Sequence, residues 1–568
     1  MAYDLVVRGG TIVDGSGLPR YRADVGVSDG VITAVGRIDE TGRREVDADG
    51  QVVTPGFVDG HTHMDAQVFW DPIGSCSCYH GVTSVVMGNC GFSLAPAPES
   101  QRDFVVRNLE RAEDISGEAM AAGISWSWDD YRSYLDAVDG LPKAINYAAY
   151  VGHSALRTYV MGARAFEEAA SDDDLAAMER ELRDALHAGA IGLSTSRSTN
   201  HLTPDGFPVA SRLAEWSEVE RLVGAMGSLG VGLFELANES QVAARDPEVR
   251  AEANARLRKL AVDTGVPVTF GVLGAGNPQI WRDQLDLLDE TAADGGRMFA
   301  QTHCRGVSVL LSFKTRLPFD KLPEWRELRA LPLDAQEELL RRPEVRERLV
   351  RAANEGDYGH AVGAEARQPR YDRIHVLERA TGRNPTLAEL AEATGRDPVE
   401  IVIDLGLESK FEVFFQQFPV KPDQAAIEEM LKHPRTAMTF SDSGAHVSQI
   451  MDSSIQTDLL ADWVRAREVF TLEQAVRMIT YVPATLWGMA DRGLVREGMA
   501  ADLNVIDPET IAPRLPELAA DLPAGARRLV QKAQGISATI VAGQPVLTDG
   551  VPTGELPGRL LRGPLARR

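Results

Sequence analysis

Cysteine is scarce in this chain of 568 residues, which contains only Cys76, Cys78, Cys90 and Cys304. So few cysteines in so long a chain exclude the disulfide framework of a small secreted domain. A single residue separates Cys76 from Cys78, a tighter spacing than zinc-binding hairpins use. We therefore expect reduced cysteines and a fold stabilised mainly by a large hydrophobic core.

Long hydrophobic runs are also missing. No stretch approaches the roughly 18 consecutive apolar residues that a membrane-spanning helix needs. The first residues, MAYDLVVRGG, lack the basic and apolar regions of a secretory signal. The sequence thus predicts a cytoplasmic protein that does not enter a membrane.

Positive charge is in deficit. Lys and Arg number 59 against 83 Asp and Glu, a formal net charge of −24. A field of this sign repels phosphate backbones and anionic lipids. The composition therefore disfavours nucleic acid and membrane surfaces as partners, and we expect a small-molecule substrate.

Both ends of the chain are predicted to be rich in β-strands. Segments such as DLVVRGGTIVDGSG near the start and GISATIVAGQPVLTDG near the end are β-rich and broken by Gly and Asp, a pattern typical of strands joined by turns. The pattern predicts a small composite β-sandwich domain formed by residues 1–55 and 485–568.

The middle of the chain alternates between buried strands and helices. Eight short apolar runs bounded by turn residues are strand candidates: GFVDGHTH, TSVVMGNCGFS, AINYAAYVGHSALR, AIGLSTSRS, GVGLFELANES, PVTFGVLGAG, RMFAQTHCRG and TAMTFSDSGAH. Eight such units predict an α/β fold, a (β/α)8 TIM-like barrel over residues 56–484. A polar, helical insertion is expected between the last two candidates, at about residues 306–435.

The strongest chemical signal is the motif GFVDGHTHMD. Its two histidines, His61 and His63, are two residues apart, so on a strand both imidazoles point to the same face and can reach one metal ion. Two imidazoles suit Zn, Fe or Ni, and active sites of TIM barrels lie at the carboxyl ends of the strands. The motif therefore predicts a metal site at the end of the first strand.

These motifs together resemble the amidohydrolase superfamily, and more closely its D-aminoacylase (N-acyl-D-amino-acid deacylase) family. The resembling segments are VTPGFVDGHTHMD, HGVTSVVMGNCGFSLAP, VGHSALR, GAIGLSTS, FSDSGAH, FTLEQAVRMIT and DRGLVREGMAADLNVIDPETI. The resemblance runs through the whole chain and thins across residues 306–435. It implies a metal-dependent barrel beside a small β-domain made from both termini.

The resemblance also implies roles for individual residues. His61 and His63 match the metal ligands of the first strand, and Cys90 in GNCGFS matches a thiolate ligand of zinc. Asp442 in FSDSGAH matches the aspartate of the last strand, which binds metal or water and acts as general base. That chemistry requires a carboxylate, because the proton of the activated water must be passed to the leaving nitrogen.

Two ligands of the family pattern are missing from this chain. The family also uses one histidine from strand five and one from strand six, but no histidine lies between residues 202 and 302. By position, Glu235 replaces the first of these, and the second falls near Val272. The metal site is therefore altered.

Three arrangements remain open at this stage. Glu235 could supply a carboxylate ligand, which zinc, manganese and iron accept, or it could pair with an arginine. His303 on the seventh strand could supply a nitrogen ligand, contact the substrate or pack in the core. A single ion could instead be held by His61, His63 and Asp442, with Cys90 and Glu235 nearby. We favour one divalent ion, zinc in the first place, with manganese or iron as alternatives.

Further polar residues follow the predicted strands. His153 could hold the oxyanion of the reaction or serve only as a hydrogen-bonding neighbour of the site. Candidates for substrate binding are Arg157, Ser196, Arg197, Arg305 and His446. Since the carboxylate-binding residues of the family are replaced here, specificity for D-amino acids is not implied.

The sequence thus predicts a metal-dependent hydrolase of C–N bonds in amides, N-acyl compounds or lactams. Asp442 is the expected base, with His153 or His303 stabilising the tetrahedral oxygen. Two alternatives are a lyase, deaminase or decarboxylase on the same barrel, and a binding protein that has lost catalysis. A homo-oligomer is an expectation from the family alone.

Overall fold

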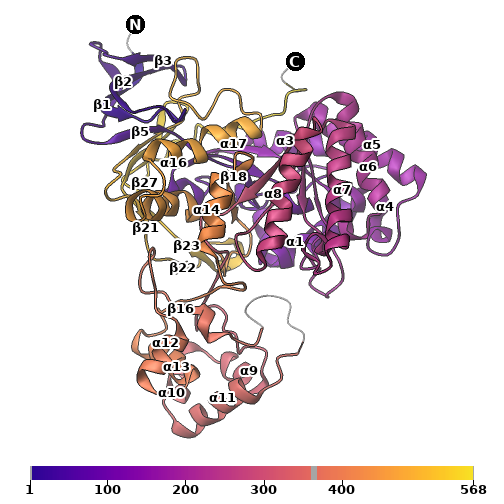
Figure 1. Ribbon diagram of the computed structural model, residues 1–568, viewed down its shortest axis with the longest axis vertical. Helices are drawn as coiled ribbons and strands as arrows, with labels where there is room; N and C mark the ends of the chain where they lie inside the picture. Colours follow the sequence, from indigo (N-terminus) through magenta and orange to yellow (C-terminus); the bar gives the residue numbers. More distant parts are fainter. Residues whose placement is uncertain (1–2, 360–366, 567–568) are drawn as a thin grey trace.

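The computed structural model describes residues 3–359 and 367–566. Three parts are visible in Figure 1: a central barrel, a β-sheet domain built from both termini, and a lobe that projects from the barrel. No helix in these two ranges is both long and apolar enough to cross a membrane.

Eight parallel strands close the barrel, as the eight apolar runs predict. In chain order they are β6 (Phe57–Asp59) continued by β7 (His61–Thr62), β8 (Val82–Met87), β9 (Asn146–Ala149) continued by β10 (Val151–Gly152), β11 (Gly192–Ser196), β12 (Leu233–Ala237), β13 (Val268–Gly271), β14 (Met298–Thr302), and β18 (Thr436–Met438) continued by β19 (Phe440–Ser443). Each strand pairs with the next, and β19 pairs with β7. The barrel is therefore closed between its first and last strands.

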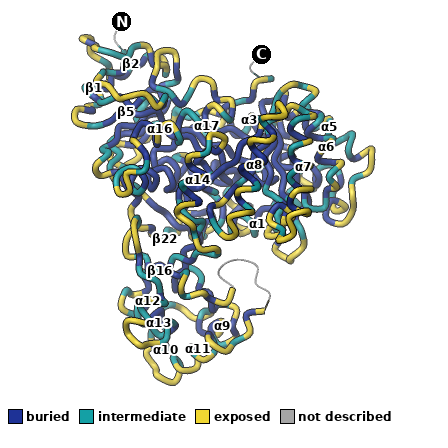
Figure 2. The backbone as a smooth tube through the Cα atoms, in the orientation of Figure 1, coloured by how far each residue is buried: buried dark blue, intermediate teal, exposed yellow. Residues whose placement is uncertain are grey.

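Helices surround the barrel and cover its strands. They are α1 (Arg102–Glu113), α2 (Gly117–Gly123), α3 (Tyr131–Gly140), α4 (His153–Met161), α5 (Asp172–Ala188), α6 (Trp216–Leu229), α7 (Pro247–Thr264), α8 (Pro278–Ala293), α14 (Gln424–Lys432), α15 (Ile455–Asp458), α16 (Leu472–Ile479) and α17 (Tyr481–Leu486). Figure 2 shows the strands as the most deeply buried part of the chain. Buried on all sides, the strands read as apolar runs rather than as an alternating pattern.

The two ends of the chain meet in one nine-stranded sheet. Its strands are β1 (Tyr3–Ile12), β2 (Tyr21–Ser28), β3 (Val31–Gly36), β4 (Gly42–Asp47), β5 (Val52–Pro55), β20 (Leu503–Ile506), β25 (Ile536–Val541), β26 (Gln544–Thr548) and β27 (Val551–Pro552). The pairing of β5 with β20 joins the two halves, and apolar residues from both ends form a common core. The expected fold class, a TIM-like barrel with a β-sandwich domain from both termini, is confirmed.

An excursion from this sheet reaches the barrel. It contains β21 (Ala512–Pro513), β22 (Glu517–Ala519), β23 (Arg528–Val530) and β24 (Ala533–Gln534). The backbone amide of Leu529 donates to the carbonyl of Val447, which follows the last barrel strand. The terminal domain thereby contributes to the wall of the barrel mouth.

The projecting lobe corresponds to the predicted insertion. It contains α9 (Pro323–Arg329), α10 (Leu333–Leu340), α11 (Pro343–Glu355), α12 (Leu387–Thr394) and α13 (Pro398–Glu408), and a small sheet of β15 (Val309–Leu311), β16 (Ile374–Val376) and β17 (Phe415–Gln417). Its apolar residues form a separate core. The lobe ends earlier than residue 435, because α14 packs against β18 and belongs to the barrel.

Candidate metal centre and active site

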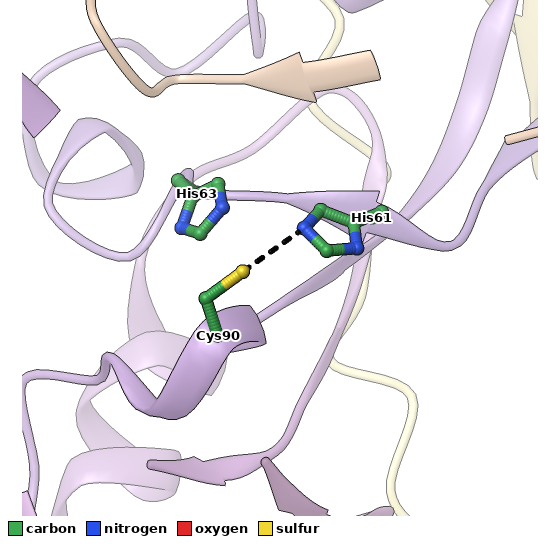
Figure 3. A group of neighbouring side chains, drawn as sticks. All are labelled: His61, His63 and Cys90. Carbon is green, nitrogen blue, oxygen red and sulfur yellow. Dashed lines mark hydrogen bonds between the residues drawn. The ribbon is translucent and has the colours of Figure 1, made fainter. Parts of the chain in front are cut away.

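The two histidines of the first strand lie at the carboxyl end of the barrel. Both are buried, and their Nε2 atoms face Asp442 of the last strand (Figure 3 shows the two rings). Nε2 of His61 lies 3.1 Å and Nε2 of His63 lies 3.5 Å from Oδ1 of Asp442. The closure of the barrel between β19 and β7 brings these residues together although 381 and 379 positions separate His61 and His63 from Asp442.

Cys90 completes the group from the turn that follows β8. Its Sγ lies 3.4 Å from Nε2 of His61, and the ligand atoms of His61, His63 and Cys90 all lie within 4.8 Å of one another. The neighbouring Gly91 has a φ of +77°, and a Cβ there would lie 2.9 Å from the backbone nitrogen of Ser196. The glycine therefore allows the turn to approach β11 closely enough to place Cys90 in the site.

The electrostatics of this group favour a positive charge at its centre. Burial alone would lower the pKa of His61, but the charges of Cys90 and Asp442 outweigh it and raise that pKa well above its ordinary value. For His63, Glu113 and Asp442 have the same effect. Burial would raise the pKa of Asp442, yet the two histidines hold it well below its usual range. Such a cluster of acidic groups around two imidazoles suits a cation.

Glu235 on the fifth strand lies directly behind Cys90. Its Oε2 accepts a hydrogen bond of 2.7 Å from the backbone amide of Cys90, while its Oε1 lies 4.0 Å from Nδ1 of His61 and has no hydrogen-bond partner within the described ranges. Complete burial raises the pKa of Glu235 to about 7. No arginine or lysine of the described residues pairs with it, so the alternative of an Arg–Glu pair does not hold.

His303 and Arg305 form a different cluster, on the loops after the seventh and eighth strands. Nε2 of His303 lies 3.4 Å from Oδ2 of Asp452, and Arg305 donates to Asp452, Ser454 and the carbonyl of Met451. His303 is therefore not among the grouped ligand atoms. The predictions that His303 replaces a missing ligand and that Arg305 is free for substrate are not supported.

His153 and Arg157 are turned away from the site, which corrects their predicted roles. The two ring nitrogens of His153 contact Thr195 at 2.8 Å and Glu218 at 2.7 Å. Arg157, fully buried, pairs with the same Glu218. Because α4 begins at His153, both side chains pack against α6, and neither can hold an oxyanion or clamp a substrate carboxylate.

The end of the fourth strand carries a further histidine that the sequence patterns did not single out. Oγ of Ser196 lies 2.6 Å from Nδ1 of His201, whose ring packs 5.1 Å from that of Phe92. Burial and the charges of His63 and His446 lower the pKa of His201 to about 3. Ser196 thus holds a neutral histidine, while His446 lies close enough to affect its charge.

Only part of the Arg197 guanidinium contacts other groups of the protein. Its guanidinium donates to the carbonyl of Ala214 and lies 3.7 Å from Glu239. Its side chain keeps 16% of its exposure, so this predicted substrate-binding arginine stays partly accessible at this end of the barrel.

A small cavity of about 20 Å³ opens beside Asp442, with room for roughly one water molecule. Its walls come from the segments after the first and last strands and from the terminal domain: Gln67, Ser75, Cys76, Asp442–Ala445, Val447, Ile450–Ser453, Arg528 and Leu529. Asp442 keeps 27% of its side chain exposed, so its carboxylate can reach a water or a substrate there.

Two residues behind the histidines were missed by sequence reasoning. Gln301 on the seventh strand contacts His61, and Glu113 at the end of α1 contacts His63. Gln301 could have been found as a polar residue two positions before His303 on an apolar strand. Nothing in the sequence distinguishes Glu113 from the other acidic residues of its helix.

The sequence model of the amidohydrolase family matches residues 44–547, so the chain belongs to that family. D-aminoacylase of Alcaligenes xylosoxydans xylosoxydans is 29% identical over 570 residues, covering 98% of this chain and 97% of that protein. The predicted resemblance to D-aminoacylases is thereby confirmed.

Two solved structures extend the comparison. N-acyl-D-glutamate deacylase from Bordetella bronchiseptica, complexed with zinc and a phosphonate inhibitor, is 25% identical with a TM-score of 0.66, covering 99% of this chain and 100% of that one. A structure of D-aminoacylase, from work on the functional role of its binuclear metal centre, is 26% identical with a TM-score of 0.65. The match covers 99% of this chain and 100% of that one. Both relatives are therefore similar over the entire fold.

Proposed function

We propose that this protein is a metal-dependent hydrolase that cleaves a C–N bond of a small molecule in an amide, N-acyl or lactam-type group. The observation that supports this most directly is the convergence of His61, His63, Cys90 and Asp442 at the carboxyl end of the barrel. The names of the relatives, D-aminoacylase and N-acyl-D-glutamate deacylase, point to the same reaction class.

The donor set fits a divalent ion, in the first place zinc. Two imidazole nitrogens, a thiolate and a carboxylate oxygen are ligands that zinc accepts in a four-coordinate site, with manganese or iron as alternatives. Glu235 adds an unpartnered, buried Oε1 behind the cysteine, which could join as a further ligand. We favour one ion because Glu235 stands where the family places the histidine of strand five, and the histidine of strand six falls near Val272.

Asp442 is the proposed general base. A divalent ion bound here would polarise the scissile carbonyl and acidify a water molecule. The Asp442 carboxylate faces both the ligand group and the adjacent cavity. It can therefore take a proton from water and return it to the leaving nitrogen. Arg197 and the neutral His201, at the end of the fourth strand, are the residues that would contact polar groups of the substrate.

The remaining expectations also belong to this proposal. A small-molecule substrate, rather than nucleic acid or a membrane surface, agrees with the net charge of −24. The four free cysteines agree with a reducing cytoplasm. A homo-oligomer is retained only from the resemblance to the family.

Substitution of the base tests the mechanism. Asp442→Asn should retain the fold and the bound metal but reduce turnover by about 100-fold or more, since the variant loses its proton acceptor. Asp39→Asn, on the exposed surface, should be fully active. Circular dichroism, elemental analysis and rates on N-acyl amino acids, lactams and imides provide the measurements. Wild-type turnover by Asp442→Asn would refute this role.

A second reaction class is favoured by the absence of the strand-five and strand-six histidines. The same metal site could support a lyase, a deaminase or a decarboxylase. A product assay separates these reactions: released carboxylate indicates hydrolysis, whereas ammonia or carbon dioxide indicates the alternatives. Purified protein that contains no stoichiometric metal would instead indicate a binding protein without catalysis.

A further inference from the structure

Each metal-site histidine has a polar partner on the side of the ring that faces away from Cys90 and Asp442. Nδ1 of His61 lies 2.6 Å from Oε1 of Gln301, and Nδ1 of His63 lies 3.3 Å from Oε1 of Glu113. All four side chains are buried, none more than 5% exposed. Because these partners are buried beside the rings, the two contacts bear directly on how the rings are oriented.

The amide of Gln301 is placed with its oxygen toward His61 and its nitrogen toward Thr269. Its Nε2 donates a hydrogen bond of 3.2 Å to Oγ1 of Thr269 on the neighbouring strand, which turns its oxygen toward His61. An amide oxygen can only accept a hydrogen bond. In its neutral form, which is the form that binds a metal, His61 therefore carries its proton on Nδ1, and the lone pair of Nε2 is directed at Cys90 and Asp442.

Glu113 contacts the second histidine from the corresponding side. Its Oε1 lies 3.3 Å from Nδ1 of His63, at ion-pair distance, while its backbone carbonyl accepts from the amide of Val447 at 3.2 Å. The next residue, Asp114, accepts from the hydroxyl of Ser448. The end of α1 is thus attached to the loop that follows Asp442. Glu113 therefore connects His63 of the first strand with the loop after the last strand.

We propose that Glu113 and Gln301 are positioning residues of the metal centre, which fix the tautomer and orientation of His63 and His61 so that both Nε2 atoms face the ion. The inference rests on the proposed function in one respect, that a divalent ion binds at His61, His63 and Cys90. Partners of this kind orient ligand histidines, and their removal weakens metal binding by about 10- to 100-fold.

Metal affinity provides the test, independently of activity. Glu113→Ala and Gln301→Leu remove the acceptors, whereas Glu113→Gln retains an oxygen in the same position. Asp103→Asn, exposed on the same helix, is the matched control. The dissociation constant for Zn²⁺ is measured against a competing chelator, and the visible spectrum of the Co²⁺-loaded protein reports the ligand geometry.

The expected result is a loss of Zn²⁺ affinity of about 10- to 100-fold in Glu113→Ala and Gln301→Leu, with altered Co²⁺ spectra. Glu113→Gln should recover most of the affinity, and Asp103→Asn should equal the wild type. Unfolding curves of the metal-free proteins separate these effects from a general loss of stability. If Glu113→Ala does not fold, Gln301→Leu decides the question.

Two results would overturn the inference, and they differ in what else they affect. Wild-type affinity and an unchanged Co²⁺ spectrum in both acceptor-free variants would remove the positioning role but leave the proposed hydrolase intact. A wild-type protein that binds no Zn²⁺ or Co²⁺ would overturn the proposed function together with it.

Discussion

Among single residues, Glu235 has the most unusual surroundings, because a carboxyl group with one unpartnered oxygen is enclosed in the barrel. Burial is the main cause of its raised pKa of about 7. In metal-free protein the neutral form is therefore favoured below about pH 7, and the stability that this group contributes is present below its unfolded pKa and lost as the pH rises through 7.

Replacement of Glu235 makes this pH dependence measurable. Without metal, Glu235→Gln should be more stable than the wild type above pH 7, by up to roughly 3 kcal/mol for a shift of this size. The difference should disappear well below pH 4.5, the ordinary pKa of a glutamate, where the wild-type carboxyl is neutral in both the folded and the unfolded state. Urea unfolding at several pH values measures it, with exposed Glu412→Gln as control. Parallel wild-type and Glu235→Gln curves would contradict the burial of an ionisable group.

Sequence patterns located some site residues and misplaced others for identifiable reasons. His61 and His63 could be predicted because strand periodicity places them on one face, and Cys90 and Asp442 because of a family resemblance. The roles of His153 and Arg157 could not, since they depend on Glu218, which comes from a helix more than 60 positions away. Such a contact is set by packing and leaves no local pattern.

At the scale of elements, the short turn Asn89–Gly91 determines whether Cys90 reaches the metal site. Gly91→Ala would introduce a Cβ against the backbone of β11 at a positive φ, a strain of about 1–3 kcal/mol before any clash is relieved. We expect lower stability and weaker Zn²⁺ binding, because the turn must move away from β11.

Calorimetry and Zn²⁺ titration of Gly91→Ala measure both effects. Gly224→Ala in α6 is the control, because an added Cβ there meets nothing within 4 Å and alanine favours a helix. If Gly91→Ala bound Zn²⁺ as tightly as the wild type, the turn would not control the position of Cys90.

The elements themselves were more predictable than their boundaries. All eight barrel strands follow from short apolar runs between turn residues, because central parallel strands are buried on both faces. The sequence predicted that the inserted lobe continues to about residue 435, because α14 has many polar residues like the helices of the lobe. Only the contact of α14 with β18 assigns this helix to the barrel. Helical periodicity shows that a helix forms, but not which core it covers.

At the scale of the molecule, the lobe and the barrel have separate hydrophobic cores. Trp325 is fully buried in the lobe, where its indole donates to the carbonyl of Leu349. Trp325→Ala should destabilise the lobe by about 3–5 kcal/mol while the zinc content of the barrel stays at the wild-type value. Hydrogen exchange across residues 309–417 and elemental analysis measure the two effects. If the variant lost zinc as well as hydrogen-exchange protection in the lobe, the lobe would support the metal centre.

The sheet shared by the two ends of the chain affects how the protein is made. β5 ends at Pro55, but its partner β20 begins only at Leu503. At a synthesis rate of about 5–20 residues per second, roughly 20–90 s pass between the emergence of these two strands from the ribosome. Throughout that interval the newly made β5 has an unsatisfied edge that could join another nascent chain. Chaperone protection of this edge during translation would therefore be a determinant of the yield of folded protein.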